Sequence, residues 1–247
     1  MDLHKQCMTN RTLVVIPARG GSVEVPRKNI RNLNGRPLIS YAIKTCKSIE
    51  RQVDVIVSTD DEEIAEVAIN CGADVPFMRP SEISGSSATL LLVVKHAFEF
   101  FNNRGVIYDA VLSVQPTCPF LTTTSLEGAI DLYETGTCDS VVSLAEFTSG
   151  HPVIAKRLDT DGTVSSFFKL PNGAITHPRQ KREAAFYPCG AFYLRSSELL
   201  NESHEDAWHL GERVKGLNLN QLESHDINSL IDFKLAEVFF EMGGLNA

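Results

Sequence analysis

The chain has 247 residues, of which 43% are hydrophobic, so it can bury the core of one large α/β domain. Its 23 basic and 31 acidic residues give a net charge of −8, which argues against a nucleic acid partner. The longest apolar run, at 90–94, is far too short to span a bilayer, so no membrane partner is expected.

Six cysteines are scattered along the chain without any C-x-x-C pair, and the N-terminus has no apolar stretch like that of a signal peptide. We therefore expect a reduced, cytoplasmic protein. The length favours a single domain, 1–247, over two independent domains.

Short apolar, β-branched runs alternate with longer segments of helical period, an order typical of a parallel sheet with helices on both faces. In chain order the pattern predicts a strand at 14–18, a helix near 37–48, a strand at 55–59, a helix from Asp61, a strand near 75–77, a helix near 87–101, a strand at 110–114, a helix near 123–135 and a strand at 140–144. Ligands of such sheets bind beyond the carboxyl ends of the strands. The segments 19–29, 58–60 and 115–119 should therefore meet at one crevice.

The alternation stops at 148–195, where Pro, Gly and polar stretches surround short extended pieces such as FYPCGAFYL at 186–194. We interpret 148–195 as an insertion or flap that covers the substrate or contacts a second subunit; a plain surface meander is the alternative. A closing helix is predicted near 229–242.

The segment 19–29, RGGSVEVPRKN, directly follows the first strand and indicates nucleoside triphosphate chemistry. A glycine pair lets backbone N–H groups approach an anion closely, while Arg19, Arg27 and Lys28 supply positive charge. The segment lacks both the P-loop pattern and the G-x-G-x-x-G fingerprint, which argues against a nicotinamide oxidoreductase. A surface turn after a strand is the plain alternative.

Four segments in order resemble the acylneuraminate cytidylyltransferase family, which includes CMP-sialic acid synthetases and relatives that act on legionaminic, pseudaminic or 3-deoxy-octulosonic acids. They are IPARGGS, PRKNI and LNGRPLI within 16–39, VIVSTDDEEIAE at 55–66, QPTCPF at 115–120 and ESHDINSLIDFKLAE at 223–237. The resemblance implies a Rossmann-like three-layer α/β sandwich of the nucleotide-diphospho-sugar transferase type, with a mostly parallel sheet and a small flap for dimerisation and substrate. It implies a homodimeric enzyme that joins CTP to a 2-keto sugar acid with Mg²⁺, or alternatively Mn²⁺, and releases pyrophosphate.

The resemblance also implies a role for each matching residue. The catalytic residues would be Arg19, Lys28 and Asp226. The nucleotide would be held by Arg19, Gly20, Gly21, Ser22, Arg27, Lys28, Asn29 and Arg79. The sugar acid would contact Gln115, Arg179, Gln180, Tyr187 and Gly190, and the metal would be held by Asp226 and Asn228.

The chain departs from the family pattern at several of these positions. Ser22, Val23 and Glu24 stand where the family's phosphate loop has Ser-Lys-Gly, and Asn228 replaces the second aspartate of a D-I-D motif. On the sugar side Leu121, Tyr187 and Cys189 are also replacements, and they suggest an acceptor group that is smaller, less polar or less anionic than that of sialic acid. Two explanations stay open: a cytidylyltransferase for an unusual acceptor, and a nucleotide-binding relative with little catalysis.

Some of these residues also have a purely structural interpretation. Asp226 could cap the closing helix, and Asp60 and Asp61 are expected to complement the dipole of the helix that follows them. Cys118 and Cys189 lie in matched motifs without a neighbouring base in the sequence. We therefore expect them to be pocket walls, with no covalent intermediate.

Overall fold

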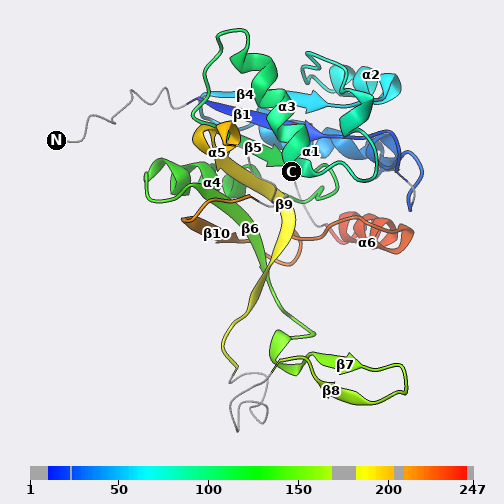
Figure 1. Cartoon of the computed structure of the whole chain (residues 1–247). Helices are drawn as coiled ribbons and strands as arrows, with labels where there is room; N and C mark the ends of the chain where they lie inside the picture. Colours follow the sequence, from blue (N-terminus) through cyan, green and yellow to red (C-terminus); the bar gives the residue numbers. More distant parts are fainter. Residues whose placement is uncertain (1–10, 23, 169–181, 203–208, 244–247) are drawn as a thin grey trace, which may run out of the picture.

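The computed structural model describes residues 11–22, 24–168, 182–202 and 209–243. Its centre is a six-stranded sheet in the order β10-β6-β9-β5-β1-β4 (Figure 1). The strands are β1 (Thr12–Pro17), β4 (Val53–Ser58), β5 (Ala110–Val114), β6 (Ser140–Glu146), β9 (Phe186–Ser196) and β10 (Val214–Asn218). β1 pairs in parallel with β4 and β5, and β10 pairs in parallel with β6. Strand β9 runs antiparallel between β5 and β6.

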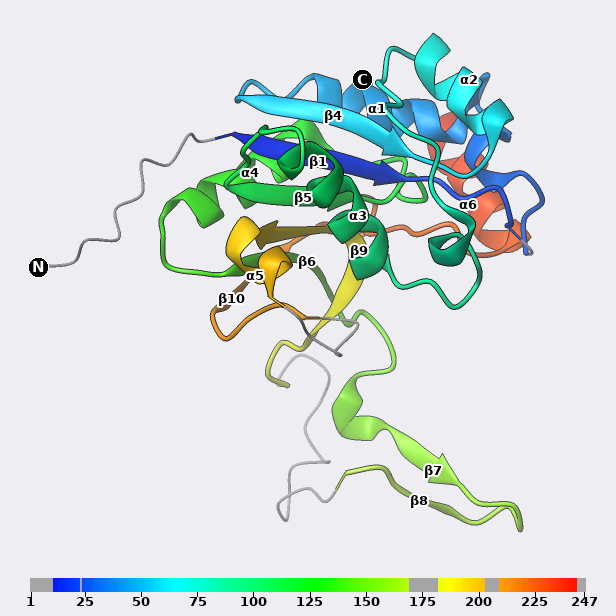
Figure 2. The ribbon, with the colours of Figure 1, turned by 45° about the horizontal axis from the view of Figure 1, so that its top comes forward.

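Helices cover both faces of this sheet and make three layers (Figure 2). They are α1 (Leu38–Lys47), α2 (Glu62–Asn70), α3 (Leu90–Asn102), α4 (Thr123–Glu134), α5 (Ser197–Asn201) and α6 (Leu230–Glu241). Short 3₁₀ turns lie at η1 (Lys28–Ile30), η2 (Ser81–Ile83) and η3 (Pro152–Ile154). No helix in the described part of the chain is both long and apolar enough to cross a membrane.

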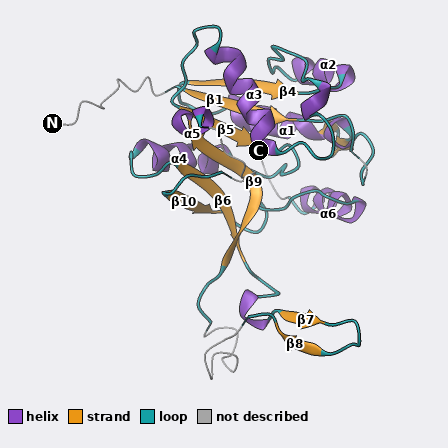
Figure 3. Ribbon diagram, viewed as in Figure 1, coloured by secondary structure: helices purple, strands orange, loops and turns teal. Residues whose placement is uncertain are grey.

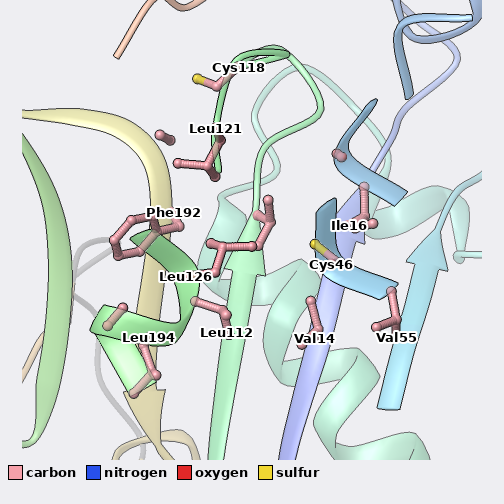
Figure 4. Close-up of a cluster of buried hydrophobic side chains, with 14 of the residues drawn as sticks. Val14, Ile16, Cys46, Val55, Leu112, Cys118, Leu121, Leu126, Phe192 and Leu194 are labelled. Atoms are coloured by element: carbon pink, nitrogen blue, oxygen red, sulfur yellow. The ribbon is translucent and has the colours of Figure 1, made fainter. Parts of the chain in front are cut away.

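The alternation of side chains along β1 explains the layers. Val14 and Ile16 point into a core shared with α1, α2 and α4, whereas Leu13 and Val15 point into a core shared with α3 and α5. Figure 4 shows Val14 and Ile16 in the first of these cores, beside Leu112 of β5. All four β1 side chains are fully buried, as expected for a central strand of a parallel sheet.

A third, smaller core fastens the closing helix to the loops that follow β1 and β5. Phe233 and Ala236 of α6 are buried against Val25 of the first loop and Phe120 of the second. The helix begins at an N-cap, Ser229, which forms a capping box with Asp232. The core thereby holds three distant segments together at one edge of the sheet.

The flap projects from the ends of β6 and β9 (Figure 3). It contains η3 and a hairpin of β7 (Lys156–Leu158) and β8 (Val164–Ser166), whose residues are exposed. A second hairpin, β2 (Asn32–Leu33) with β3 (Arg36–Pro37), precedes α1.

The expected α/β fold with a mostly parallel sheet is confirmed, but three details differ. No strand forms at 75–77; isolated bridges at Asp74 and Met78 border β4 instead. Residues 186–195, assigned from the sequence to the flap, belong to β9 inside the sheet, and β10 was not predicted. The extended piece at 186–194 was predicted, but its place inside the sheet was not, because an antiparallel insertion depends on pairing with distant strands, which local patterns do not encode.

Candidate functional site

The three loops that were expected to converge do meet at the carboxyl edge of the sheet. Gly20, in the loop after β1, donates its N–H to Asp60 Oδ1 after β4 at 3.1 Å. Lys28 Nζ donates to the carbonyl of Ile227 at 2.8 Å, and the Ile227 N–H donates to the carbonyl of Thr117 after β5 at 2.9 Å. The crevice predicted from strand order thus contains a fourth segment, the loop before α6.

The phosphate loop, residues 18–29, is held in place by its own polar groups. The Asn29 side chain is buried and donates from Nδ2 to the carbonyl of Arg19 at 3.0 Å. The N–H of Ser22 donates to the carbonyl of Gly20 at 3.0 Å. The N–H groups of Gly20 and Ser22 are therefore already paired within the protein, and they shape the loop rather than point outward.

Arg27 takes part in ion pairs with the start of α2. Its guanidinium contacts both carboxylate oxygens of Asp61, at 2.5 and 3.1 Å, and pairs with Glu63. Its backbone adopts the left-handed conformation with φ of 55°, which is uncommon for a residue with a side chain. In this structure Arg27 connects the phosphate loop to the start of α2, a contact that was not predicted from the sequence.

Lys28, near the end of the phosphate loop, reaches the loop that precedes α6 and contains Asp226. Burial lowers the pKa of its ammonium group, the Asp226 carboxylate opposes this shift, and Arg19 adds to it. Because Lys28, Arg19 and Asp226 interact electrostatically, two cations and one carboxylate share a small region. This combination suits a site in which a polyanion and a metal ion meet.

Asp226 and Asn228 form a pair at the edge of a cleft. Asn228 Nδ2 donates to Asp226 Oδ2 at 2.8 Å, and the Cys118 sulfur lies 4.0 Å from Asp226 Oδ1. Because Ser229 is the N-cap of α6, Asp226 does not cap this helix, and the structural alternative for Asp226 is wrong. Burial raises the pKa of the Cys118 thiol well above its ordinary value, which disfavours the nucleophilic thiolate.

The cleft beside Asp226 has a volume of about 540 Å³, a size suited to a small-molecule ligand. Three predicted site residues, Tyr187, Asp226 and Asn228, lie in its wall together with Cys189. The rest of the wall comes from the end of β6 and the residues just after it, and from the end of β10 and the segment that follows: Ala145, Glu146, Thr148, Asn218, Leu219, Asn220, Gln221, Ser224 and His225. A larger cavity of about 710 Å³ lies at the base of the flap, and the described residues of its wall include none of the predicted site residues.

The remaining substrate residues divide into two groups. The Gln115 N–H donates to the carbonyl of Ala191 at 2.9 Å, which places Gln115 next to Gly190 at the junction of β5 and β9. Gly190 has φ of 81°, a conformation that favours glycine. Arg179 and Gln180 lie outside the described residues, as does Val23.

Sequence reasoning did not identify the polar residues at 218–225 as part of the cleft wall. Asn218, Asn220 and Ser224 lie there because β10 is the edge strand beside β6. Their only signal in the sequence is their closeness to Asp226 along the chain.

The residues present fit a divalent metal ion of the Mg²⁺ type. Asp226 supplies a half-exposed carboxylate at the cleft, and Asn228 adds an amide beside it. The described residues contain no group of three or more His, Cys, Asp or Glu that could hold a metal by itself. Mg²⁺ needs no such cage, since one or two carboxylates and the substrate's phosphates are its usual ligands.

A mostly parallel α/β sheet with a cationic glycine loop and an aspartate at its carboxyl edge is an arrangement suited to a nucleotidyltransferase. Comparison with known proteins agrees: residues 13–158 match the family model described as cytidylyltransferase. The chain belongs to this cytidylyltransferase family.

Similar proteins extend over nearly the whole chain. The CMP-N,N'-diacetyllegionaminic acid synthase of Legionella pneumophila is 31% identical over 94% of this chain and 97% of its own length. The pseudaminic acid cytidylyltransferase of Campylobacter jejuni is 32% identical over the same shares. The solved structure of a CMP:2-keto-3-deoxy-manno-octonic acid synthetase complexed with CTP has the same fold, with a TM-score of 0.66 at 15% identity over 94% of this chain and 99% of that chain.

Proposed function

We propose that this enzyme transfers the CMP group of CTP to a 2-keto-3-deoxy sugar acid of the nonulosonic type and releases pyrophosphate. One observation carries the proposal: Lys28 of the phosphate loop joins the loop that contains Asp226, beside a cleft of about 540 Å³. This contact brings the groups suited to a triphosphate next to a cavity suited to an acceptor. The substrate class agrees with the similar proteins, whose names refer to legionaminic and pseudaminic acids.

In this reaction the anomeric hydroxyl of the sugar acid attacks the α-phosphorus of CTP. A new oxygen–phosphorus bond forms and the hydroxyl proton is released to solvent, while the bond from the α-phosphorus to the bridging oxygen breaks and its electron pair leaves with pyrophosphate. Arg19 and Lys28, which interact electrostatically with each other, would stabilise the negative charge that builds up on the transferring and leaving oxygens. Alignment and neutralisation of charge supply most of the catalysis in such transfers.

Asp226 and Asn228 would hold the metal ion, here proposed as Mg²⁺. When bound, the ion polarises phosphate oxygens and neutralises their charge. Asn228 retains an oxygen ligand but lacks the charge of a second aspartate, so we propose weaker metal binding than two carboxylates would give.

For the acceptor side, the carboxylate of the sugar acid needs a cationic partner, a role proposed for Arg179. Tyr187, with its ring centroid 4.8 Å from that of Phe147, forms an aromatic wall of the cleft. With Cys189 this wall suits an acceptor group that is smaller or less polar than the corresponding group of sialic acid.

A homodimer and a cytoplasmic location are also part of the proposal. Apolar residues of the flap hairpin are strongly exposed, with Leu158 at 75% and Val164 at 61%. An exposed apolar surface on a projecting hairpin supports contact with a second subunit. Fractionation of cells that produce the chain tests the location.

The decisive experiment measures pyrophosphate release with Mg²⁺ and each nucleoside triphosphate, using sialic, legionaminic, pseudaminic and 3-deoxy-octulosonic acids as acceptors. We expect release with CTP and one of these acids. If CTP binds by calorimetry but no acid supports release, catalysis with these acceptors is rejected in favour of a binding-only relative or an unusual acceptor. If CTP does not bind, the proposal fails entirely.

A further inference from the structure

A single carboxylate, Asp60, contacts two segments that have different expected roles at the nucleotide. Its Oδ1 atom accepts a hydrogen bond from the Gly20 N–H of the phosphate loop at 3.1 Å. The same atom accepts a hydrogen bond from Arg79 Nη2 at 3.0 Å. Asp60 lies two residues after the end of β4 and next to Thr59, which forms an isolated bridge with Met78.

The Arg79 side chain is only 4% exposed, so the Asp60 carboxylate, rather than water, balances the charge of its guanidinium. Its backbone N–H donates to the carbonyl of Thr59 at 2.7 Å, so both ends of the residue are tied to the segment after β4. Its Nε atom is buried without a hydrogen-bond partner among the described residues. A buried guanidinium that lost its carboxylate would keep an uncompensated charge.

We propose that Asp60 is a positioning residue that couples the phosphate loop to the segment that recognises the cytosine base. The inference rests on the proposed function together with two roles implied by the family resemblance: the loop containing Gly20 would hold the triphosphate, and Arg79 would contact the cytidine. It changes the interpretation of Asp60 from the sequence, where this residue only complemented the dipole of α2. Asp61, by contrast, accepts from the Ile64 N–H and does cap α2.

The coupling has a physical basis in the shared oxygen atom. Movement of Gly20 toward or away from a bound phosphate displaces the group that orients Arg79, and the reverse also holds. Binding of the triphosphate part and of the nucleoside part of CTP should therefore favour each other, since linkage between two sites is reciprocal.

Two substitutions of Asp60 distinguish its contact with Gly20 from its contact with Arg79. Asp60→Asn retains an oxygen acceptor for the Gly20 N–H but removes the charge that pairs with Arg79, whereas Asp60→Ala removes both. Asp131→Asn is the matched control, because it breaks an Asp–Arg pair of 2.9 Å with Arg51 on the exposed surface. The readouts are kcat/KM for CTP relative to UTP, inhibition by tripolyphosphate, and the coupling between tripolyphosphate and cytidine measured by calorimetry.

For Asp60→Asn we expect the preference for CTP over UTP to fall about tenfold, since a charge-assisted hydrogen bond is lost, while tripolyphosphate inhibition changes little. Asp60→Ala should weaken both by about tenfold and abolish the coupling. Asp131→Asn should leave every readout unchanged. A general loss of folding would lower activity without changing the CTP to UTP ratio. A change in this ratio therefore distinguishes a positioning role of Asp60 from a merely structural one.

An unchanged CTP to UTP ratio in Asp60→Asn would overturn the inference, as would intact coupling in either Asp60 variant. If the wild-type protein releases no pyrophosphate but binds cytidine and tripolyphosphate, the proposed catalysis fails and calorimetry still decides the coupling. If neither probe binds the wild-type protein, both proposals are rejected.

Discussion

At the scale of single residues, Gly20 illustrates how closely the site is assembled. A Cβ atom at this position would lie 2.6 Å from Asp61 Oδ2 and 2.9 Å from Asp61 Cβ. Asp61 has little freedom to withdraw, since it contacts both Arg27 and the Ile64 N–H. The glycine is therefore required by the close approach of two loops.

This crowding predicts the effect of Gly20→Ala. Overpacking should cost about 1–3 kcal/mol and lower the Tm by several degrees, while the displaced loop raises the KM for CTP. Gly21→Ala is the control for stability, because a Cβ at Gly21 has no neighbour within 4 Å. Thermal unfolding and steady-state kinetics test this, and a Gly20→Ala protein with unchanged Tm and KM would contradict the steric argument.

The Asp226 and Asn228 pair leads to a prediction about metal dependence. Asp226→Asn should raise the Mg²⁺ concentration for half-maximal activity by more than about tenfold, since the charged ligand is lost. Asn228→Asp should lower this concentration, because it adds a second carboxylate next to the first. Activity measured across a Mg²⁺ titration checks both variants, and a shift in the same direction for the two would argue against a metal at this pair.

At the scale of elements, the start of α2 is stabilised by Asp61. The hydrogen bond from Arg27 lowers the pKa of the Asp61 carboxyl, burial opposes this, and the Ile64 N–H adds to the lowering. Since the pKa is lower in the folded state, the carboxylate contributes stability at pH values above its unfolded pKa. That contribution is lost as the pH falls through the folded-state pKa.

The lowered pKa of Asp61 predicts how the stability of an Asp61 variant depends on pH. Asp61→Ala should reduce the free energy of unfolding by about 1–2 kcal/mol at pH 7, as loss of an N-cap does. The difference from the wild-type protein should shrink as the pH falls below the usual range of an aspartate. Urea unfolding at a series of pH values measures it, with Glu66→Ala in the exposed middle of α2 as the control. A difference that stays constant down to the lowest pH would show that the carboxylate charge is not responsible.

At the scale of the whole molecule, the flap is the feature that points outward from the sheet. Leu158 and Val164 face each other across its hairpin as exposed partners. Leu158→Asp should convert a dimer to a monomer in sedimentation experiments without changing the circular dichroism of the fold, because a charge would be buried in the contact. Ile107→Asp, at an apolar residue 64% exposed outside the flap, should leave the dimer intact. A Leu158→Asp protein that still sediments as a dimer would place the interface elsewhere.

Much of the fold could be predicted from local sequence patterns. Helices α1, α3, α4 and α6 begin and end within a few residues of their expected positions, because their periodicity and their flanking residues are local signals. The segment at 75–77 was predicted as a strand, but it makes only isolated bridges beside β4. Strand β9 was assigned to the flap because its place between β5 and β6 depends on pairing with residues far away in the sequence.

The candidate site shows the same division. The phosphate loop and Asp226 were identified from residue types and motif order, and the structure brings Lys28 to the loop of Asp226. The ion pairs of Arg27 with Asp61 and of Arg79 with Asp60 were not expected. Each of these pairs joins two loops, and residue type alone does not choose between a ligand and a protein carboxylate as the partner of an arginine.

The sequence by itself determined the family and the order of most strands and helices, and it predicted the segments that would carry the chemistry, because all of these depend on short patterns. Only the tertiary structure decided that β9 lies inside the sheet and that Asp60 joins the phosphate loop to Arg79. Contacts such as that between Lys28 and Ile227, which are 199 residues apart, exist only once the sheet has brought its carboxyl edge together. Such contacts depend on the geometry of the assembled sheet, which no short segment of the sequence encodes.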